Sequence, residues 1–139
     1  MGELAKHKNP KTVMPNVTIL SGTITIGAAG AVSAQTDNRD GGVTFVKNAG
    51  AGRYDGTIHR SYRRVISSDA NMIGPTVGTV PNAAKLAYPT GISAAMVAGT
   101  AAISTFSIVC TAADGATATN PTSGDIVSWE LQVSDSPRA

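Results

Sequence analysis

Residues Gly124–Ser134 read G-D-I-V-S-W-E-L-Q-V-S, and this stretch predicts the class of fold. Its apolar positions are Val127, Trp129, Leu131 and Val133, and its polar positions include Ser128, Glu130, Gln132 and Ser134. Because successive side chains of a strand face opposite sides of the sheet, this alternation predicts one buried face and one largely solvated face. The turn-forming cluster Thr119–Gly124 stands just before it. Other strands should assemble around the face that carries Trp129.

The rest of the chain contains further short segments of this kind, separated by residues that favour turns. We expect strands at Val17–Ile26, Ala31–Gln35, Val43–Lys47, Arg53–His59 and Ile103–Thr111, and an extended course over Ala70–Val80. Ser61–Ser67 fits a short helical turn or an extended corner equally well, and Lys85–Val97 is mixed. About eight short strands with such spacing are typical of an all-β sandwich or barrel. We predict an antiparallel β-sandwich, specifically a jelly roll.

The alternation also predicts which side chains share the core. The apolar phases of the strands place six residues between two sheets: Phe45, Phe106, Ile108, Val127, Trp129 and Leu131. Cys110, the only cysteine, lies on the same strand face as Phe106, so we interpret it as a small core residue.

The chain of 139 residues is long enough for one domain with its own core. We divide it into an extended basic arm, residues 1–15, and a sandwich, residues 16–139. The arm carries Lys6, Lys8 and Lys11 close together, and two prolines favour an extended course. We expect it to anchor the protein to a partner; the alternative is a flexible terminus without a role.

Composition narrows the functional classes. Only 14% of the residues are charged, which suggests that neighbouring subunits cover part of the surface, and we predict a homotrimer. No stretch is apolar for long enough to span a membrane. His7 and His59 have no neighbours at metal-ligand spacing, Cys110 has no identifiable base, and the acids are scattered through turns. We therefore expect no enzyme, no metal and no cofactor.

One segment concentrates cations. Arg53, Arg60, Arg63 and Arg64 lie with His59 around two tyrosines, Tyr54 and Tyr62. Such a patch can contact nucleic acid. The net charge of the chain is only +2, so we favour ion pairs between subunits instead. The predicted contact residues for a partner protein or a neighbouring subunit are Lys6, Lys8, Lys11, Arg53, Arg60, Arg63 and Arg64.

Two parts of the chain resemble small structural proteins of tailed bacteriophages. Gly41–Ile66 reads G-G-V-T-F-V-K-N-A-G-A-G-R-Y-D-G-T-I-H-R-S-Y-R-R-V-I, with a Gly-x-Gly-x-Tyr turn at Gly50, Gly52 and Tyr54 and a Tyr-Arg-Arg segment after it. The second part reads T-F-S-I-V-C-T-A-A-D-G and then N-P-T-S-G-D-I-V-S-W-E-L-Q-V-S. In it, Pro121, Gly124 and Asp125 match a turn that similarly links the last two strands in that group.

The resemblance implies a β-sandwich, often a jelly roll, that assembles as a trimer on a virion. On that basis we expect a non-enzymatic protein on the capsid exterior that decorates and cements the shell, with the major capsid protein as its partner. The alternative is a tail fibre, spike or baseplate module that binds a host carbohydrate or another tail protein. The matches concern turns, so the resemblance assigns no functional residue.

Overall fold

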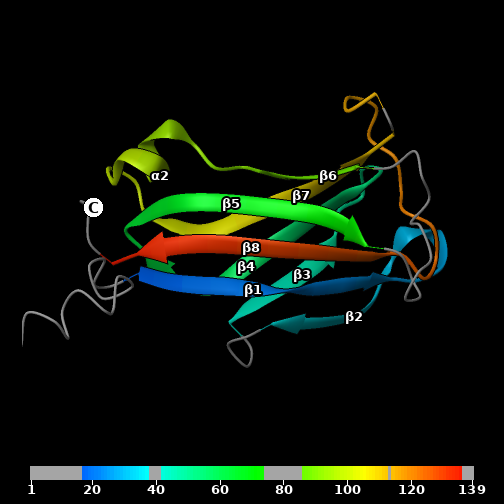
Figure 1. The fold of residues 1–139 in the computed structure, drawn as a ribbon, viewed down its shortest axis with the longest axis horizontal. Coiled ribbons are helices and arrows are strands. Elements are labelled where there is room, and N and C mark those ends of the chain that lie inside the picture. Colours follow the sequence, from blue (N-terminus) through cyan, green and yellow to red (C-terminus); the bar gives the residue numbers. More distant parts are fainter. Residues whose placement is uncertain (1–16, 38–41, 74–85, 113, 136–139) are drawn as a thin grey trace, which may run out of the picture.

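The computed structural model describes residues 17–37, 42–73, 86–112 and 114–135. These residues form two antiparallel four-stranded sheets (Figure 1). The strands are β1 (Val17–Ile26), β2 (Val32–Asp37), β3 (Val43–Lys47), β4 (Arg53–Tyr62), β5 (Arg64–Ile73), β6 (Leu86–Thr90), β7 (Ile103–Thr111) and β8 (Ile126–Ser134). The all-β prediction with two antiparallel sheets is confirmed.

The stretch that predicted the fold occupies the interior of a sheet, as expected. The first sheet has the order β2-β1-β8-β5, so β8 is hydrogen-bonded on both sides. Leu20 of β1 lies opposite Leu131, and Ala70 of β5 lies opposite Trp129. The second sheet has the order β3-β4-β7-β6 and lies behind the first in Figure 1.

Three aromatic rings join the two sheets at the centre of the core. Phe45 comes from β3, Phe106 from β7 and Trp129 from β8, and all three side chains are buried. The ring centroids of Phe45 and Trp129 are 5.3 Å apart, and those of Phe45 and Phe106 are 5.4 Å apart. Their edge-on geometry is one that aromatic pairs favour. The core of Phe45, Phe106, Ile108, Val127, Trp129 and Leu131 is confirmed, and buried Cys110 belongs to it.

A glycine makes room for this cluster. Gly56 lies opposite Phe45 in the β3–β4 pair. A Cβ at Gly56 would lie 2.7 Å from Cε1 of Phe45, closer than real Cβ contacts allow. The missing side chain on β4 therefore leaves room for the phenylalanine ring, which packs against Trp129.

The structure decides the segments that the sequence left open. Ser61–Ser67 is an extended corner: β4 continues to Tyr62, Arg63 forms a bend, and β5 begins at Arg64. Within Lys85–Val97, β6 is followed by the short helix α2 (Ala94–Ala98). Ser93 caps α2, because its Oγ accepts a hydrogen bond from the backbone N–H of Met96.

The start of β7 departs from strict alternation. Ile103 lies three positions before Phe106, yet both side chains are buried in the core. The β4–β7 register shifts between Thr57 and Tyr62, where the pairing resumes with Ile103. Such an irregularity changes which face a side chain meets. The arm, residues 1–15, lies outside the described residues.

Candidate functional site

The predicted group of arginines separates into two places. Arg60, Arg63 and Arg64 lie at the corner between β4 and β5, and we call these three residues the basic corner. Arg53 begins β4, at the other end of that strand. Strands rise about 3.3 Å per residue, so Arg53 and Arg60 lie roughly 20 Å apart along β4. The idea of one local patch around Tyr54 and Tyr62 is wrong; both tyrosines are buried.

Arg60 is held against its own chain. Its Nη2 atom donates a hydrogen bond to Oδ2 of Asp135, just beyond β8. The guanidinium also lies 4.9 Å from the centroid of the Tyr62 ring. An exposed ion pair of this kind contributes little to stability but orients the side chain. The corner therefore presents one arginine that is partly neutralised.

The other two arginines of the corner make no such pair among the described residues. Arg63 is exposed, and its backbone N–H donates to the carbonyl of Ser134 at 2.9 Å. Arg64 is half-buried, and its Nε atom is buried without a hydrogen-bond partner within the described parts of the chain. A buried N–H without an acceptor is costly to the folded state.

The basic corner lies beside the point where the arm joins the sandwich. Ser134 of β8 is opposite Arg64 on one side and opposite Val17, the first residue of β1, on the other. The three predicted arm lysines, Lys6, Lys8 and Lys11, lie outside the described residues.

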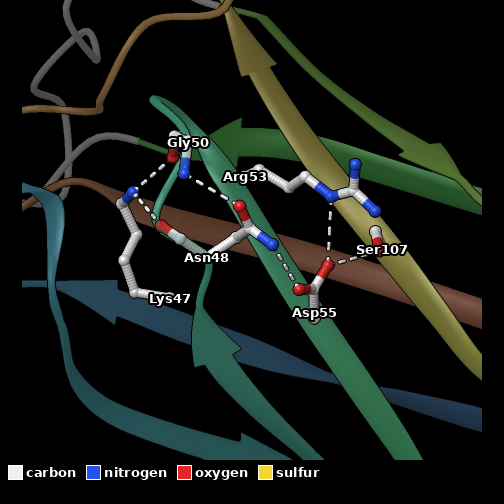
Figure 2. A network of polar contacts seen from close by, with 6 residues as sticks. All are labelled: Lys47, Asn48, Gly50, Arg53, Asp55 and Ser107. Carbon is white, nitrogen blue, oxygen red and sulfur yellow. Dashed lines mark hydrogen bonds and ion pairs between the residues drawn. The ribbon is translucent and has the colours of Figure 1, made fainter.

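Arg53 belongs to a polar network on the outer face of the second sheet (Figure 2). Asp55 accepts hydrogen bonds from Asn48 Nδ2 at 2.7 Å, from Ser107 Oγ at 2.7 Å and from Arg53 Nε at 3.1 Å. The bonds from Asn48 and Ser107, aided by the Arg53 guanidinium, lower the pKa of the Asp55 carboxyl. The Arg53 guanidinium is thus paired with Asp55 of its own subunit.

The turn of this network is closed by a lysine. Nζ of Lys47 donates to the carbonyl of Asn48 at 2.7 Å and to that of Gly50 at 2.6 Å (Figure 2). The backbone N–H of Gly50 donates to Oδ1 of Asn48. The β3–β4 turn is therefore a rigid structural unit.

The two turns that carry the phage resemblance meet in the structure. The backbone N–H of Gly52 donates to Oδ1 of Asn120 at 2.7 Å, although 68 residues separate them. Tyr54 donates its hydroxyl to the carbonyl of Gly30 at 2.6 Å. Burial, and to a lesser extent Cys110, raises the pKa of Tyr54, which keeps this donor protonated. These residues close the end of the sandwich opposite to the basic corner.

Sequence reasoning missed a hollow on the outer face of the first sheet. It has a volume of about 360 Å³ and is lined by Ser21, Gly22, Thr23, Asp69, Asn71, Ser128, Trp129 and Glu130. Ser21, Glu130 and Asp69 lie side by side across three strands. In the sequence, only the alternating polar residues of β8 indicated a solvated face here. The partners on β1 and β5 depend on the sheet order, which the sequence does not show.

The two acids of this hollow have neutral hydrogen-bond partners. Oδ2 of Asp69 accepts from Asn71 Nδ2 at 3.0 Å, and Oε1 of Glu130 accepts from Gln132 Nε2 at 3.2 Å. Across the described ranges, neither acid forms an ion pair. The hollow therefore offers negative charge and hydrogen-bonding groups to solvent.

A second hollow, of about 350 Å³, lies between β5 and β6, where the two sheets meet at one edge. Its lining includes Asp69, Met72, Leu86 and Tyr88. It combines one acid with partly exposed apolar side chains. Its lining residues do not form a catalytic or metal-binding arrangement.

The groups with possible reactivity are placed apart. Cys110 is fully buried, and Nε2 of His59 lies 2.7 Å from the Thr44 hydroxyl. Within the described residues, no three His, Cys, Asp or Glu side chains gather as a metal site. Those residues also contain no helix that is long and apolar enough to cross a membrane.

No protein-family model, curated protein or solved structure matches this chain.

Proposed function

We propose that this chain is a non-enzymatic virion structural protein that decorates and cements a bacteriophage capsid as a homotrimer. Its partner is the major capsid protein, bound on the exterior of the shell. The observation that carries this proposal is the location of the basic corner beside Val17, where residues 1–16 join. The cations of the corner therefore lie beside the point where the chain enters the sandwich.

This arrangement suits a protein that caps a shell. The end opposite to the corner is closed by hydrogen bonds such as Gly52 to Asn120, and the core between the sheets is continuous. An extended segment that lies across a neighbour gains main-chain hydrogen bonds and charge contacts along its length. We infer that the lysines Lys6, Lys8 and Lys11, aided by Arg60, contact an acidic surface of the shell.

We further propose that the sandwich is a jelly roll. Two antiparallel sheets of four strands are what a double-sheet jelly roll requires. The chain also passes between the sheets from β2 to β3, from β4 to β5, from β5 to β6 and from β7 to β8, as in folds built from Greek keys.

Retention on particles of the source phage tests the function. Deleting residues 2–14 should leave the sandwich folded, while retention falls, and more so at raised salt, because salt screens lysine contacts. Arg60→Gln should weaken retention less. Arg53→Gln is the matched control, since both arginines are exposed and ion-paired but lie at opposite ends of β4. Full and equally tight decoration by the deletion variant would contradict the anchoring role.

Copy number separates a decoration protein from a tail component. A protein that cements the shell should be present in purified particles in numbers comparable to the major shell protein. Quantitative mass spectrometry measures this ratio directly. If purified particles contain far fewer copies of this protein than of the major shell protein, the protein belongs to the tail.

The hollow on the first sheet supports one second candidate, a fibre or spike module that binds a carbohydrate. Hydroxyl, amide and carboxylate groups such as Ser21, Asn71 and Glu130 are the kind that hydrogen-bond sugar hydroxyls. Under this candidate, a glycan array should identify a ligand, and Asn71→Ala should abolish that binding without unfolding the protein. Absence of any glycan signal would reject it.

A further inference from the structure

Among the described residues, the charged side chains without an ion pair or loop contact fall into two complementary groups. Of the acids in the described residues, Asp55 and Asp135 are ion-paired, while Asp114 and Asp125 bond to their own loops and Asp37 accepts from Gly42. Asp69 and Glu130 remain in the hollow. Of the described cations, Lys47 bonds to its turn, Arg53 and Arg60 are ion-paired, and Arg63 and Arg64 remain at the corner.

From this complementarity we infer that a second copy of this chain docks on the outer face of the first sheet, with its Arg63 and Arg64 against Asp69 and Glu130. The inference deepens the proposed homotrimer and rests on it. A guanidinium can bind a carboxylate with two parallel hydrogen bonds, which gives such a contact a defined geometry. The corner of one subunit thus meets the hollow of the next.

The docking face also has apolar side chains between and beside these charges. Ile19 is 47% exposed and Ile73 is 46% exposed. Ile19 lies opposite Gln132, between the row of Arg64 and the row of Glu130. Exposed ion pairs alone contribute little, so the burial of these isoleucines supplies affinity while the charges select the orientation.

The contact closes a ring. We propose that the contact runs head to tail, from the corner of one subunit to the hollow of the next, and a heterologous interface of this kind forms a closed ring when its rotation permits. In a ring of three copies, the basic corner of each copy contacts the hollow of the next, so no corner and no hollow is left without a partner. A dimer of the same two surfaces would instead require each copy to use both surfaces on one partner.

Native mass spectrometry and analytical ultracentrifugation of the free protein test the contact. The unaltered protein should be a trimer at micromolar concentration. R63Q/R64Q and D69N/E130Q should each weaken the trimer about tenfold or more. The control A31E/T57E changes the net charge by the same amount as R63Q/R64Q. It alters exposed residues outside the corner and the hollow, so it should leave the trimer intact.

Charge exchange makes the test specific to this pairing. R63E/R64E and D69K/E130K should each be monomeric, and the chain that carries all four substitutions should form trimers again. Mixing the two monomeric variants should give no closed trimer, because at least one of three interfaces joins like charges. A closed trimer from that mixture would overturn the pairing, and so would a trimer that survives either reversal.

Two further outcomes keep this inference separate from the proposed function. If deleting residues 2–14 dissolves the trimer while R63Q/R64Q keeps it, the arm supplies the cations and the inference is wrong. A trimer that assembles through the corner but is not retained on particles would contradict the capsid role and leave the contact standing. Circular dichroism of each variant shows that its monomer is folded.

Discussion

The side-chain amide of Gln35 pairs with the main chain of Phe45 as a neighbouring strand would. Its Nε2 donates to the carbonyl of Phe45 at 3.2 Å, and its Oε1 accepts from the backbone N–H of Phe45 at 2.7 Å. Gln35 belongs to β2 at the edge of the first sheet, and Phe45 belongs to β3 at the edge of the second. One side chain thus closes the seam between two sheets whose edge strands would otherwise expose unpaired groups.

Gln35→Leu should therefore destabilise the protein. It removes both bonds and leaves the part-buried N–H and carbonyl of Phe45 unsatisfied, which costs about 1–3 kcal/mol. Urea unfolding measures this cost. Ser33→Ala, on the same strand, removes one exposed hydrogen bond and should change stability by less than about 0.5 kcal/mol. Equal effects of the two substitutions would contradict the role of Gln35 in the seam.

Trp129→Ala should reduce the free energy of unfolding by about 3–5 kcal/mol. Its side chain is only 2% exposed and contacts the rings of Phe45 and Phe106. Trp129→Phe should cost clearly less, because the indole N–H has no hydrogen-bond partner within the described residues and no hydrogen bond is lost. Denaturant unfolding followed by circular dichroism compares the three proteins. A phenylalanine variant as unstable as the alanine variant would show that the indole N–H has a partner.

Gly52→Ala should be strongly destabilising, whereas Gly50→Ala should be tolerated. Gly52 has φ of +66°, and a Cβ there would lie 2.4 Å from the carbonyl oxygen of Cys110. Left-handed strain and the backbone clash together cost on the order of 2 kcal/mol or more. At Gly50 the nearest atom to an added Cβ is Oδ1 of Asn48, at 3.3 Å, a side chain that can adjust. Thermal unfolding of the two variants should differ clearly, and similar midpoints would refute this account of the turn.

The Asp55 network should make stability depend on pH in acid. The pKa of Asp55 is lowered in the folded state, so its contribution is present above the ordinary pKa of the unfolded chain. It is lost as the pH falls through the folded value. Between about pH 5 and pH 2, Asp55→Asn should therefore lose less stability than the unaltered protein.

Carbon-detected NMR titration tests the cause of this shift. The pKa of Asp55 should lie below its ordinary value and should rise in Ser107→Ala, which removes one of the two main donors. Asp114 is the internal control, because Thr117 and neighbouring backbone N–H groups lower its pKa to about 2 without any part of this network. An unchanged Asp55 titration in Ser107→Ala would show that Ser107 does not contribute.

The sequence by itself determined the class of fold and the orientation of most strands. A period of two is local, so the alternation around Trp129 was enough to place Val127, Trp129 and Leu131 in the core. The boundaries of β1, β3 and β7 also agree with their predicted ranges. Turn formers mark these boundaries because they restrict the backbone within a few residues.

Only the tertiary structure decided which distant residues meet. Gln35 and Phe45, Gly52 and Asn120, and Asp55 and Ser107 are brought together by sheet order and register. The same order places Asp69 beside Glu130. No local pattern encodes these contacts, because strand pairing depends on long-range packing and on the closure of the loops between strands.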